Sequence, residues 1–271
     1  GLKLERLGVY RLIRPEAEAM WRPALAEKEW QRYDGRFIPS AEENGGHWET
    51  SKRLPESWTI HYKNLKMRVL TSASRHVGVF PEQASQWDWT GSRIENARRP
   101  LQVLNLFGYT GLATLAAAAA GASVTHVDAS RKAITWAKEN QTLSNLADKP
   151  IRWIVDDALK FVQREARRGT RYEGIILDPP KFGRGPKGEV WEFFKLITEL
   201  LQSCKEVLSP NPSFVVITAY AVKASALTLH YTMKELMSKW KGEVEAGEIV
   251  LEEESAGRLL STAIFARWSA I

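Results

Sequence analysis

The chain has 271 residues, of which 44% are hydrophobic and 26% are charged, the mixture of an ordinary globular protein. This composition excludes a wholly disordered chain, a collagen-like repeat and a coiled coil. Lysine and arginine outnumber aspartate and glutamate by 38 to 32, and the net charge of +6 favours a polyanionic partner without requiring one.

Several kinds of site and segment are not expected. The apolar run from Leu112 to Ala122 is far shorter than the roughly 20 residues that cross a bilayer. No segment has the layout of a secretory signal. The single cysteine, Cys204, excludes an intramolecular disulfide, and the five histidines lack ligand spacing. We therefore expect a cytoplasmic protein with neither a metal nor a membrane contact.

The chain divides near residues 98–100 into an N-terminal extension (1–99) and a second domain (100–271). In the extension a helix is possible around Glu16 to Trp30. Apolar and polar residues alternate from Trp58 to Leu70, which predicts a β-hairpin that turns at Lys63-Asn64. Pro81 stands where a further helix would begin. The extension is therefore expected to be β-rich and to carry this hairpin.

Strand and helix patterns alternate regularly after residue 100. Strands are predicted at 101–107, 122–127, 152–155, 172–177 and 213–219, and two more lie between 244 and 268. Helices are predicted at 112–120, 130–143, 157–168, 190–208 and 225–240, with a loop rich in glycine and lysine before residue 190. Cys204 lies on the apolar stripe of helix 190–208 and is expected to be buried. Such alternation predicts an α/β fold, a doubly wound Rossmann-like sheet of seven strands.

The carboxyl ends of the first four of these strands carry the candidate site. One strand runs into the turn 105–111, and the others end in Asp128, Asp156-Asp157 and Asp178-Pro179-Pro180. In an open α/β sheet, ligands bind outside the carboxyl ends of the strands. Together these residues indicate one crevice lined by carboxylates and a glycine turn.

The turn and Asp128 favour a nucleoside that lacks phosphates. Asp128 lies 20 residues after Gly108, the spacing at which a carboxylate accepts hydrogen bonds from a ribose. The glycines do not form G-x-G-x-x-G, and no basic residue is offered to a phosphate here. Alternatives remain: Gly108 and Gly111 could serve helix–strand packing, Asp128 could start a helix, and Asp157 could cap one instead of binding an adenine amino group.

Four segments of the sequence carry a resemblance to a known family. They are 104–111 (LNLFGYTG), 127–130 (VDAS), 157–158 (DA) and 177–182 (LDPPKF). Together they resemble class I S-adenosylmethionine-dependent methyltransferases. The likeness is closest to bacterial large-subunit ribosomal RNA methyltransferases that modify cytosine C5 or guanine. It extends from Leu65 to Trp268 and includes 78–83 (GVFPEQ), similar to a segment that borders the donor pocket in those enzymes.

The resemblance implies a role for each matching residue. S-adenosylmethionine would be the cofactor, Asp128 and Ala129 would hold its ribose, and Asp157 with Ala158 its adenine. Asp178 and Pro179 would face the methyl group, with Phe80 and Gln83 bordering the pocket. The methionine part would lie on the turn, at Asn105, Phe107, Gly108, Tyr109, Thr110 and Gly111.

The sequence departs from the cytosine-C5 members in one chemical respect. Those members carry a cysteine after the fifth strand or after the Asp-Pro-Pro motif, whereas here Tyr220 follows the fifth strand and no cysteine follows Pro180. Carbon C5 needs a thiolate added to the ring, but a nitrogen can attack the donor once the two are aligned. N-methylation of a base, with catalytic Asp178, Pro179 and Phe182, is therefore predicted.

The segment after Pro180 is the predicted contact with ribosomal RNA. Phe182 could stack on an extruded base or pack beneath the loop, and Lys181, Arg184 and Lys187 could meet phosphates or face water. The residues before Trp58 do not obviously supply the RNA-binding domain of the resembling enzymes. Two alternatives therefore stay open: a methyltransferase for a small molecule or protein, and a binding module that holds a nucleoside or RNA without catalysis.

Overall fold

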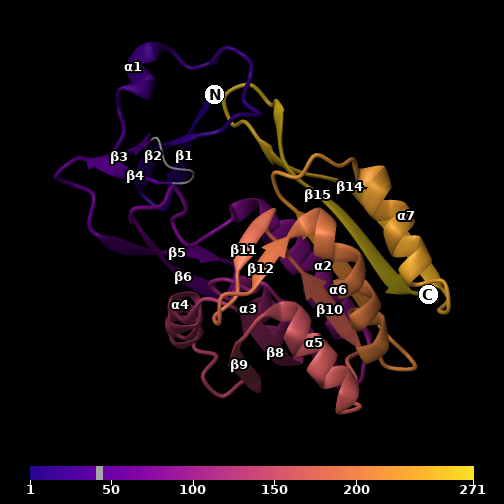
Figure 1. The fold of residues 1–271 in the computed structure, drawn as a ribbon. Coiled ribbons are helices and arrows are strands. Elements are labelled where there is room, and N and C mark those ends of the chain that lie inside the picture. The colour runs from indigo at the N-terminus through magenta and orange to yellow at the C-terminus, as the bar shows by residue number, and fades with distance from the viewer. Residues whose placement is uncertain (41–44) are drawn as a thin grey trace. The chain divides into compact units, whose positions relative to one another are not determined.

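The computed structural model describes residues 1–40 and 45–271 (Figure 1). Contacts between residues divide them into two units. The smaller unit comprises Gly1–Pro81 together with Val250–Ser261, and the larger comprises Glu82–Ile249 with Thr262–Ile271. The domain boundary expected between residues 99 and 100 stays a prediction. Each unit is described by itself below.

The smaller unit is built mainly of β-structure. Strands β1 (Leu2–Leu7), β2 (Tyr10–Pro15), β3 (Gly35–Pro39) and β4 (Gly46–Thr50) form a sheet in that order, in which β2 and β3 are parallel. The predicted hairpin is confirmed as β5 (Ser57–Tyr62) and β6 (Leu65–Leu70), and Lys63 at its turn has a left-handed φ of 50°.

The helix considered possible over Glu16–Trp30 is wrong for most of its length. Only one helical turn forms, α1 (Glu27–Trp30). Pro23 supplies a physical reason, because proline lacks the N–H a helix needs and pushes the preceding residue, Arg22, away from the helical region.

The larger unit contains the predicted seven-stranded sheet, in the order β14-β15-β13-β10-β7-β8-β9. Pairing is parallel from β13 across to β9, and β15 runs antiparallel to β13. The strands are β7 (Gln102–Leu106), β8 (Ser123–Asp128), β9 (Ile151–Val155), β10 (Gly174–Leu177), β13 (Phe214–Ala219), β14 (Gly242–Glu252) and β15 (Leu259–Ala270). The helices are α2 (Ala84–Asn96), α3 (Leu112–Ala119), α4 (Arg131–Leu143), α5 (Ala158–Arg167), α6 (Phe193–Val207) and α7 (Ala226–Leu236).

Helices cover both faces of this sheet, as a doubly wound fold requires (Figure 1). Helix α6 contacts α5 and α7, and their side chains share one core cluster with β7, β10 and β13. Helices α2 and α3 contribute to another cluster, which holds Leu101, Val103 and Phe214. All four residues of β10 are buried, which explains its continuous apolar sequence.

The segment expected to be a glycine-rich loop is instead a hairpin. Strands β11 (Phe182–Arg184) and β12 (Val190–Glu192) pair antiparallel, and α6 therefore begins at Phe193 rather than at Val190. Val190 and Trp191 favour a strand over a helix, because branched and aromatic side chains suit the pleated conformation. Trp191 is buried and anchors the hairpin to the core of the larger unit.

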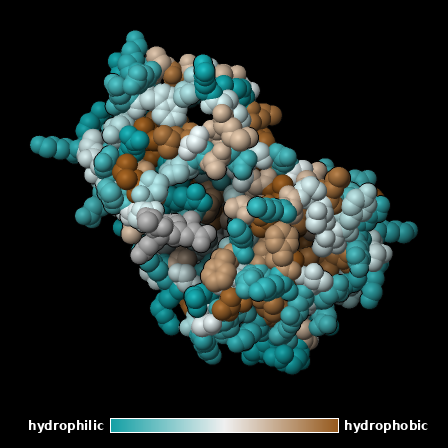
Figure 2. Space-filling model, turned by 45° about the horizontal axis from the view of Figure 1, so that its top comes forward, coloured by the Kyte–Doolittle hydropathy of each residue, from teal (hydrophilic) through white to brown (hydrophobic). Residues whose placement is uncertain are grey.

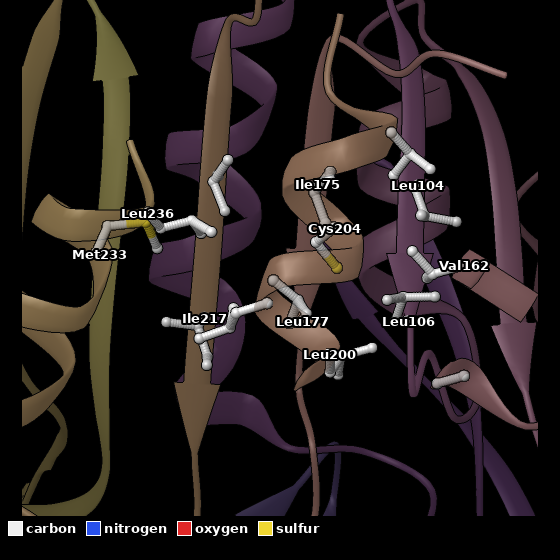
Figure 3. Close-up of a cluster of buried hydrophobic side chains, with 14 of the residues drawn as sticks. Leu104, Leu106, Val162, Ile175, Leu177, Leu200, Cys204, Ile217, Met233 and Leu236 are labelled. Atoms are coloured by element: carbon white, nitrogen blue, oxygen red, sulfur yellow. The ribbon is translucent and has the colours of Figure 1, made fainter. Parts of the chain in front are cut away.

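Cys204 lies inside this core, as predicted. Figure 3 shows its sulfur on α6 among apolar side chains from β7, β10 and α5. The residue is 0% exposed, and burial raises the pKa of its thiol. The side chain therefore acts as a small hydrophobe of the core.

The surface in Figure 2 is largely hydrophilic, with hydrophobic side chains interspersed, which is ordinary for a folded domain. Among the described residues, no helix combines the length and apolar character that a membrane crossing requires. The same part of the chain contains no group of three histidine, cysteine, aspartate or glutamate side chains placed to hold a metal.

Candidate functional site

The strand order reverses at the centre of the large sheet. From β7 the chain proceeds outward through β8 and β9, and it then returns to β10 on the other side of β7 and continues to β13. A crevice opens outside the carboxyl ends of the strands at such a switch point. The two segments that flank it are the turn after β7 and Asp178 after β10, and the Asp178 N–H donates to Leu106 O at 3.3 Å.

The turn 105–111 is held in an unusual backbone conformation. Phe107, Tyr109 and Gly111 all have left-handed φ angles, of 58°, 49° and 83°. Such angles cost free energy in residues other than glycine, and they concentrate where a backbone meets a ligand. A Cβ on Gly111 would also come within 2.8 Å of the Ala137 side chain. Gly111 is therefore required by both conformation and space.

Gly108 is required for a different reason. Its φ is not left-handed, but an added Cβ would overlap the ring of His126 beneath it. His126 is 0% exposed, and its Nδ1 lies 2.8 Å from Thr114 Oγ1, which also accepts a hydrogen bond from Asn105 Nδ2. Burial lowers the pKa of His126 to about 3, so the ring is neutral. The turn therefore rests on a rigid, uncharged polar layer.

This layer was not foreseen from the sequence. The spacing of His126 suits no metal and gives it no other evident role. Asn105, expected to be part of the turn that holds the donor, has a side chain that is 1% exposed and donates to Thr114. A second tie comes from α4, where the Asn140 side chain donates to Thr110 O at 3.0 Å. A polar residue in the middle of a buried strand, such as His126 in β8, is the signal that could have revealed the layer.

Asp128 lies directly beside the turn. Its Oδ2 accepts the Tyr109 N–H and its Oδ1 accepts the Ser130 N–H, both at 2.8 Å. Burial raises the pKa of Asp128, and the two hydrogen bonds oppose that shift. The helix-start interpretation and a ligand role are compatible, since each carboxylate oxygen has a second lone pair. Ser130 caps α4 as predicted, accepting the Ala133 N–H at 3.2 Å.

Asp157 follows β9 and caps α5, accepting the Lys160 N–H at 2.9 Å, as its alternative interpretation predicted. Asp156 accepts the Asp157 N–H and pairs with Arg164. Ala158 is buried, whereas Asp157 and Ala129 keep part of their surface accessible. The backbone N–H of Asp156 donates to the backbone carbonyl of Asp128, so the acidic end of β9 lies next to Asp128.

Asp178 lies in a cluster of polar side chains that the sequence did not reveal. Gln83 Nε2 donates to Asp178 Oδ2 at 3.1 Å, and the neighbouring Glu82 is 7% exposed. Tyr220, directly after β13, adds a hydroxyl group. Burial raises the pKa of this hydroxyl, and the negative charge of Asp178 raises it further. Burial and the charge of Glu82 raise the pKa of Asp178 to about 7, against the opposing Gln83 hydrogen bond.

The β11–β12 hairpin is tied to the same strand ends. Trp191 Nε1 donates to Pro180 O at 2.6 Å, and its ring lies 4.9 Å from that of Phe107. Pro179 is buried beside Asp178. The four residues predicted to bind the substrate are exposed on the segment that forms the hairpin: Lys181, Phe182, Arg184 and Lys187. The side chain of Phe182 is 55% exposed.

Phe80 belongs to the smaller unit, where its ring lies 5.2 Å from that of His76. The larger unit alone thus brings together the turn, Asp128, Asp157, Gln83 and Asp178. These strand ends offer carboxylates, a closely approachable backbone and a bulky aromatic hairpin.

A family model described as S-adenosylmethionine-dependent methyltransferase matches residues 29–244. The chain belongs to this family. Its fold, its enzyme class and its methyl donor, S-adenosylmethionine, are thereby those that the sequence motifs implied.

Individual relatives agree. A methyltransferase structure from Agrobacterium tumefaciens, described as SAM-dependent, is 49% identical, with a TM-score of 0.96 over 100% of this chain and 88% of that chain. SMU.776, solved in complex with S-adenosylhomocysteine (SAH), shares the fold at a TM-score of 0.69 and 21% identity, over 89% of this chain and 63% of that one. The ribosomal RNA large subunit methyltransferase K/L of Shewanella frigidimarina is 38% identical over 115 residues, which are 42% of this chain and 16% of that protein.

The strand ends fit the methyl donor on the evidence of their own geometry. A Cβ at Gly108 or Gly111 would overlap His126 or Ala137, so both glycines are needed for the turn to pack closely on the residues beneath it. The donor carries hydroxyl, amino and cationic groups, which carboxylates such as Asp128 and Asp178 can accept or balance.

Proposed function

We propose that this methyltransferase transfers a methyl group to a nitrogen atom of a base in ribosomal RNA. The observation that carries the choice of nitrogen is the position of Cys204. It is the chain's single cysteine, it is 0% exposed, and it lies in the core on α6 rather than at the strand ends. A thiolate that could activate cytosine C5 is therefore lacking in the site of this chain.

The proposed donor site uses the residues that the resemblance assigned. The turn from Asn105 to Gly111 would hold the methionine part, Asp128 and Ala129 the ribose, and Asp157 with Ala158 the adenine. Gln83 would border the pocket. When bound, S-adenosylmethionine supplies a methyl group already activated by a sulfonium.

The remaining task of the protein is to align an acceptor. Asp178 and the carbonyl of Pro179 can accept hydrogen bonds from an amino group and so direct its nitrogen. Phe182, which is 55% exposed, presents a ring on which an extruded base can stack. Because Trp191 ties the hairpin to Pro180, stacking at Phe182 would be coupled to the position of the Asp-Pro-Pro segment.

Two observations support RNA as the substrate. Lys181, Arg184 and Lys187 are all exposed on the hairpin segment, where phosphates could meet them. The chain also matches part of relatives named for the large-subunit ribosomal RNA, although the match covers 16% of the first of them.

Mass spectrometry of nucleosides tests this proposal. The purified protein is incubated with ribosomal RNA and a donor bearing a deuterated methyl group, and the RNA is digested to nucleosides. We expect one N-methylated nucleoside to carry the label, and the Asp178→Asn variant to lose most of it. Labelled 5-methylcytosine would refute the nitrogen target, while label found in protein or in a small molecule would refute RNA.

A further inference from the structure

A cluster of buried and half-buried acid, amide and phenol side chains lies at the ends of β10 and β13. We call Glu82, Gln83, Asp178 and Tyr220 the acid cluster. Glu82 and Gln83 are 7% and 8% exposed. Gln83 donates to one oxygen of Asp178 at 3.1 Å, while the other oxygen, Oδ1, is buried and has no hydrogen-bond partner among the described residues.

The charges around Asp178 oppose its ionisation. Among the described residues, the charge that acts on Asp178 is that of the Glu82 carboxylate, with no lysine or arginine contributing, and the charge of Asp178 in turn raises the pKa of the Tyr220 hydroxyl. One donor, Gln83, serves the carboxylate form. A buried carboxylate with an unpaired oxygen next to a second carboxyl group is costly, whereas the protonated acid is not. The cluster thus favours a neutral Asp178 beside an empty site.

We infer that Asp178 holds a proton when the donor site is empty and releases it to solvent when the sulfonium of S-adenosylmethionine binds, with Glu82 as the positioning residue that keeps the proton on Asp178. The inference rests on the proposed placement of the donor next to Asp178. On binding, the O–H bond of Asp178 breaks and its proton passes to the buffer. The carboxylate that remains is balanced by the sulfonium charge.

This coupling distinguishes the donor from its product. SAH carries a neutral thioether, so its sulfur does not stabilise the ionised form of Asp178. Binding of the donor should therefore strengthen relative to SAH as the pH rises, by about tenfold between about pH 6 and pH 8 if the sulfonium lowers the pKa of Asp178 by about two units from about 7. Near neutral pH, the acceptor would then meet a fully ionised Asp178 when the methyl donor is bound and a half-protonated one when it is not.

Isothermal titration calorimetry in two buffers with different ionisation enthalpies tests the inference without any turnover. Near pH 7, where a group with a pKa of about 7 is half protonated, we expect binding of S-adenosylmethionine to release about half a proton more than binding of SAH. Asp178→Asn should remove the part of this difference that comes from Asp178, whereas any part that comes from the amino group of the ligand should remain in that variant. Glu82→Gln should reduce it, since Asp178 then ionises more readily in the empty site.

The possible outcomes separate this inference from the proposed function. Equal proton release for the two ligands, or a difference that is as large in Asp178→Asn as in wild type, would overturn the inference while leaving donor binding intact. Failure of both ligands to bind the wild-type chain would instead refute the proposed donor site. If the Asp178→Asn variant binds neither ligand, Glu82→Gln is compared with wild type instead. An unchanged difference in proton release between the two ligands would then overturn the inference.

Discussion

Replacing Gly108 by alanine should damage both the stability of the fold and donor binding, because the added methyl group has nowhere to go. Its Cβ would overlap the His126 ring. That ring is held by Thr114 on one side and packs against Trp153 at a centroid distance of 4.7 Å. It is 0% exposed and cannot turn outward without breaking this layer.

The expected size of the effect follows from overpacking a rigid site. Forcing a methyl group into a filled core costs about 1–3 kcal/mol. We expect Gly108→Ala to lower the free energy of unfolding by about that amount. Movement of the turn by the same strain should weaken SAH binding about tenfold or more, since about 1.4 kcal/mol corresponds to tenfold. Urea unfolding and calorimetric titration with SAH measure the two effects.

A double-mutant cycle identifies the cause. In a His126→Ala background the added methyl group enters vacated space, so Gly108→Ala should cost close to nothing, giving a coupling of about 1–3 kcal/mol. Gly91→Ala is the matched control. Its Cβ would meet Ala120 at an ordinary 3.8 Å, and alanine within α2 should stabilise the helix by about 0.5–1 kcal/mol. An equal loss for Gly108→Ala in both backgrounds would refute the steric argument.

Three further predictions concern the strand ends. The pKa of Asp178 is raised to about 7, so its ionisation lowers the stability of the fold as the pH rises above the ordinary aspartate pKa of 3.8. Asp178→Asn should therefore stabilise the protein by up to about 4 kcal/mol near pH 8 and hardly at all near pH 4. Unfolding in urea at each pH measures this difference. Trp191→Phe keeps a ring but loses the hydrogen bond to Pro180; unfolding curves should show a loss of about 1 kcal/mol, and an unchanged methylation rate would count against the proposed coupling of the hairpin. Phe182→Ala should leave stability within about 0.5 kcal/mol of wild type while RNA methylation falls, and equal activity would remove the stacking role.

The periodic parts of the fold could be predicted from the sequence. Strands β7 to β10 and helices α3 to α5 were predicted within a few residues, because each combines a strong apolar pattern with a cap or a glycine. Ser130 and Gly121 are examples: one accepts the Ala133 N–H, and the other takes a left-handed φ of 104° after α3. These local signals do not depend on distant contacts.

The segments that failed depend on tertiary structure or on a few special residues. The segment of the β11–β12 hairpin was expected to be a loop because it is rich in glycine. Its strand pairing depends on the burial of Trp191, a tertiary contact. The helix expected around Glu16 does not form over most of its length, because Pro23 disfavours the helical conformation of the residue that precedes it.

Within the site, the acidic strand ends were evident, but their supports were not. Glu82 precedes α2 and Tyr220 follows β13, and only the folded sheet brings them to Asp178. His126 likewise gains its role from Gly108, which lies on the neighbouring strand end. Such contacts join residues from 18 to 96 positions apart, which a one-dimensional pattern does not encode.

A crystal structure of this chain grown with SAH tests the central claim most directly. The account predicts ligand density outside the carboxyl ends of β7, β8, β9 and β10, with the ribose at Asp128, the adenine at Asp157 and the sulfur directed toward Asp178. Density for the ligand at any other place on the chain, or a ribose that does not contact Asp128, would contradict it.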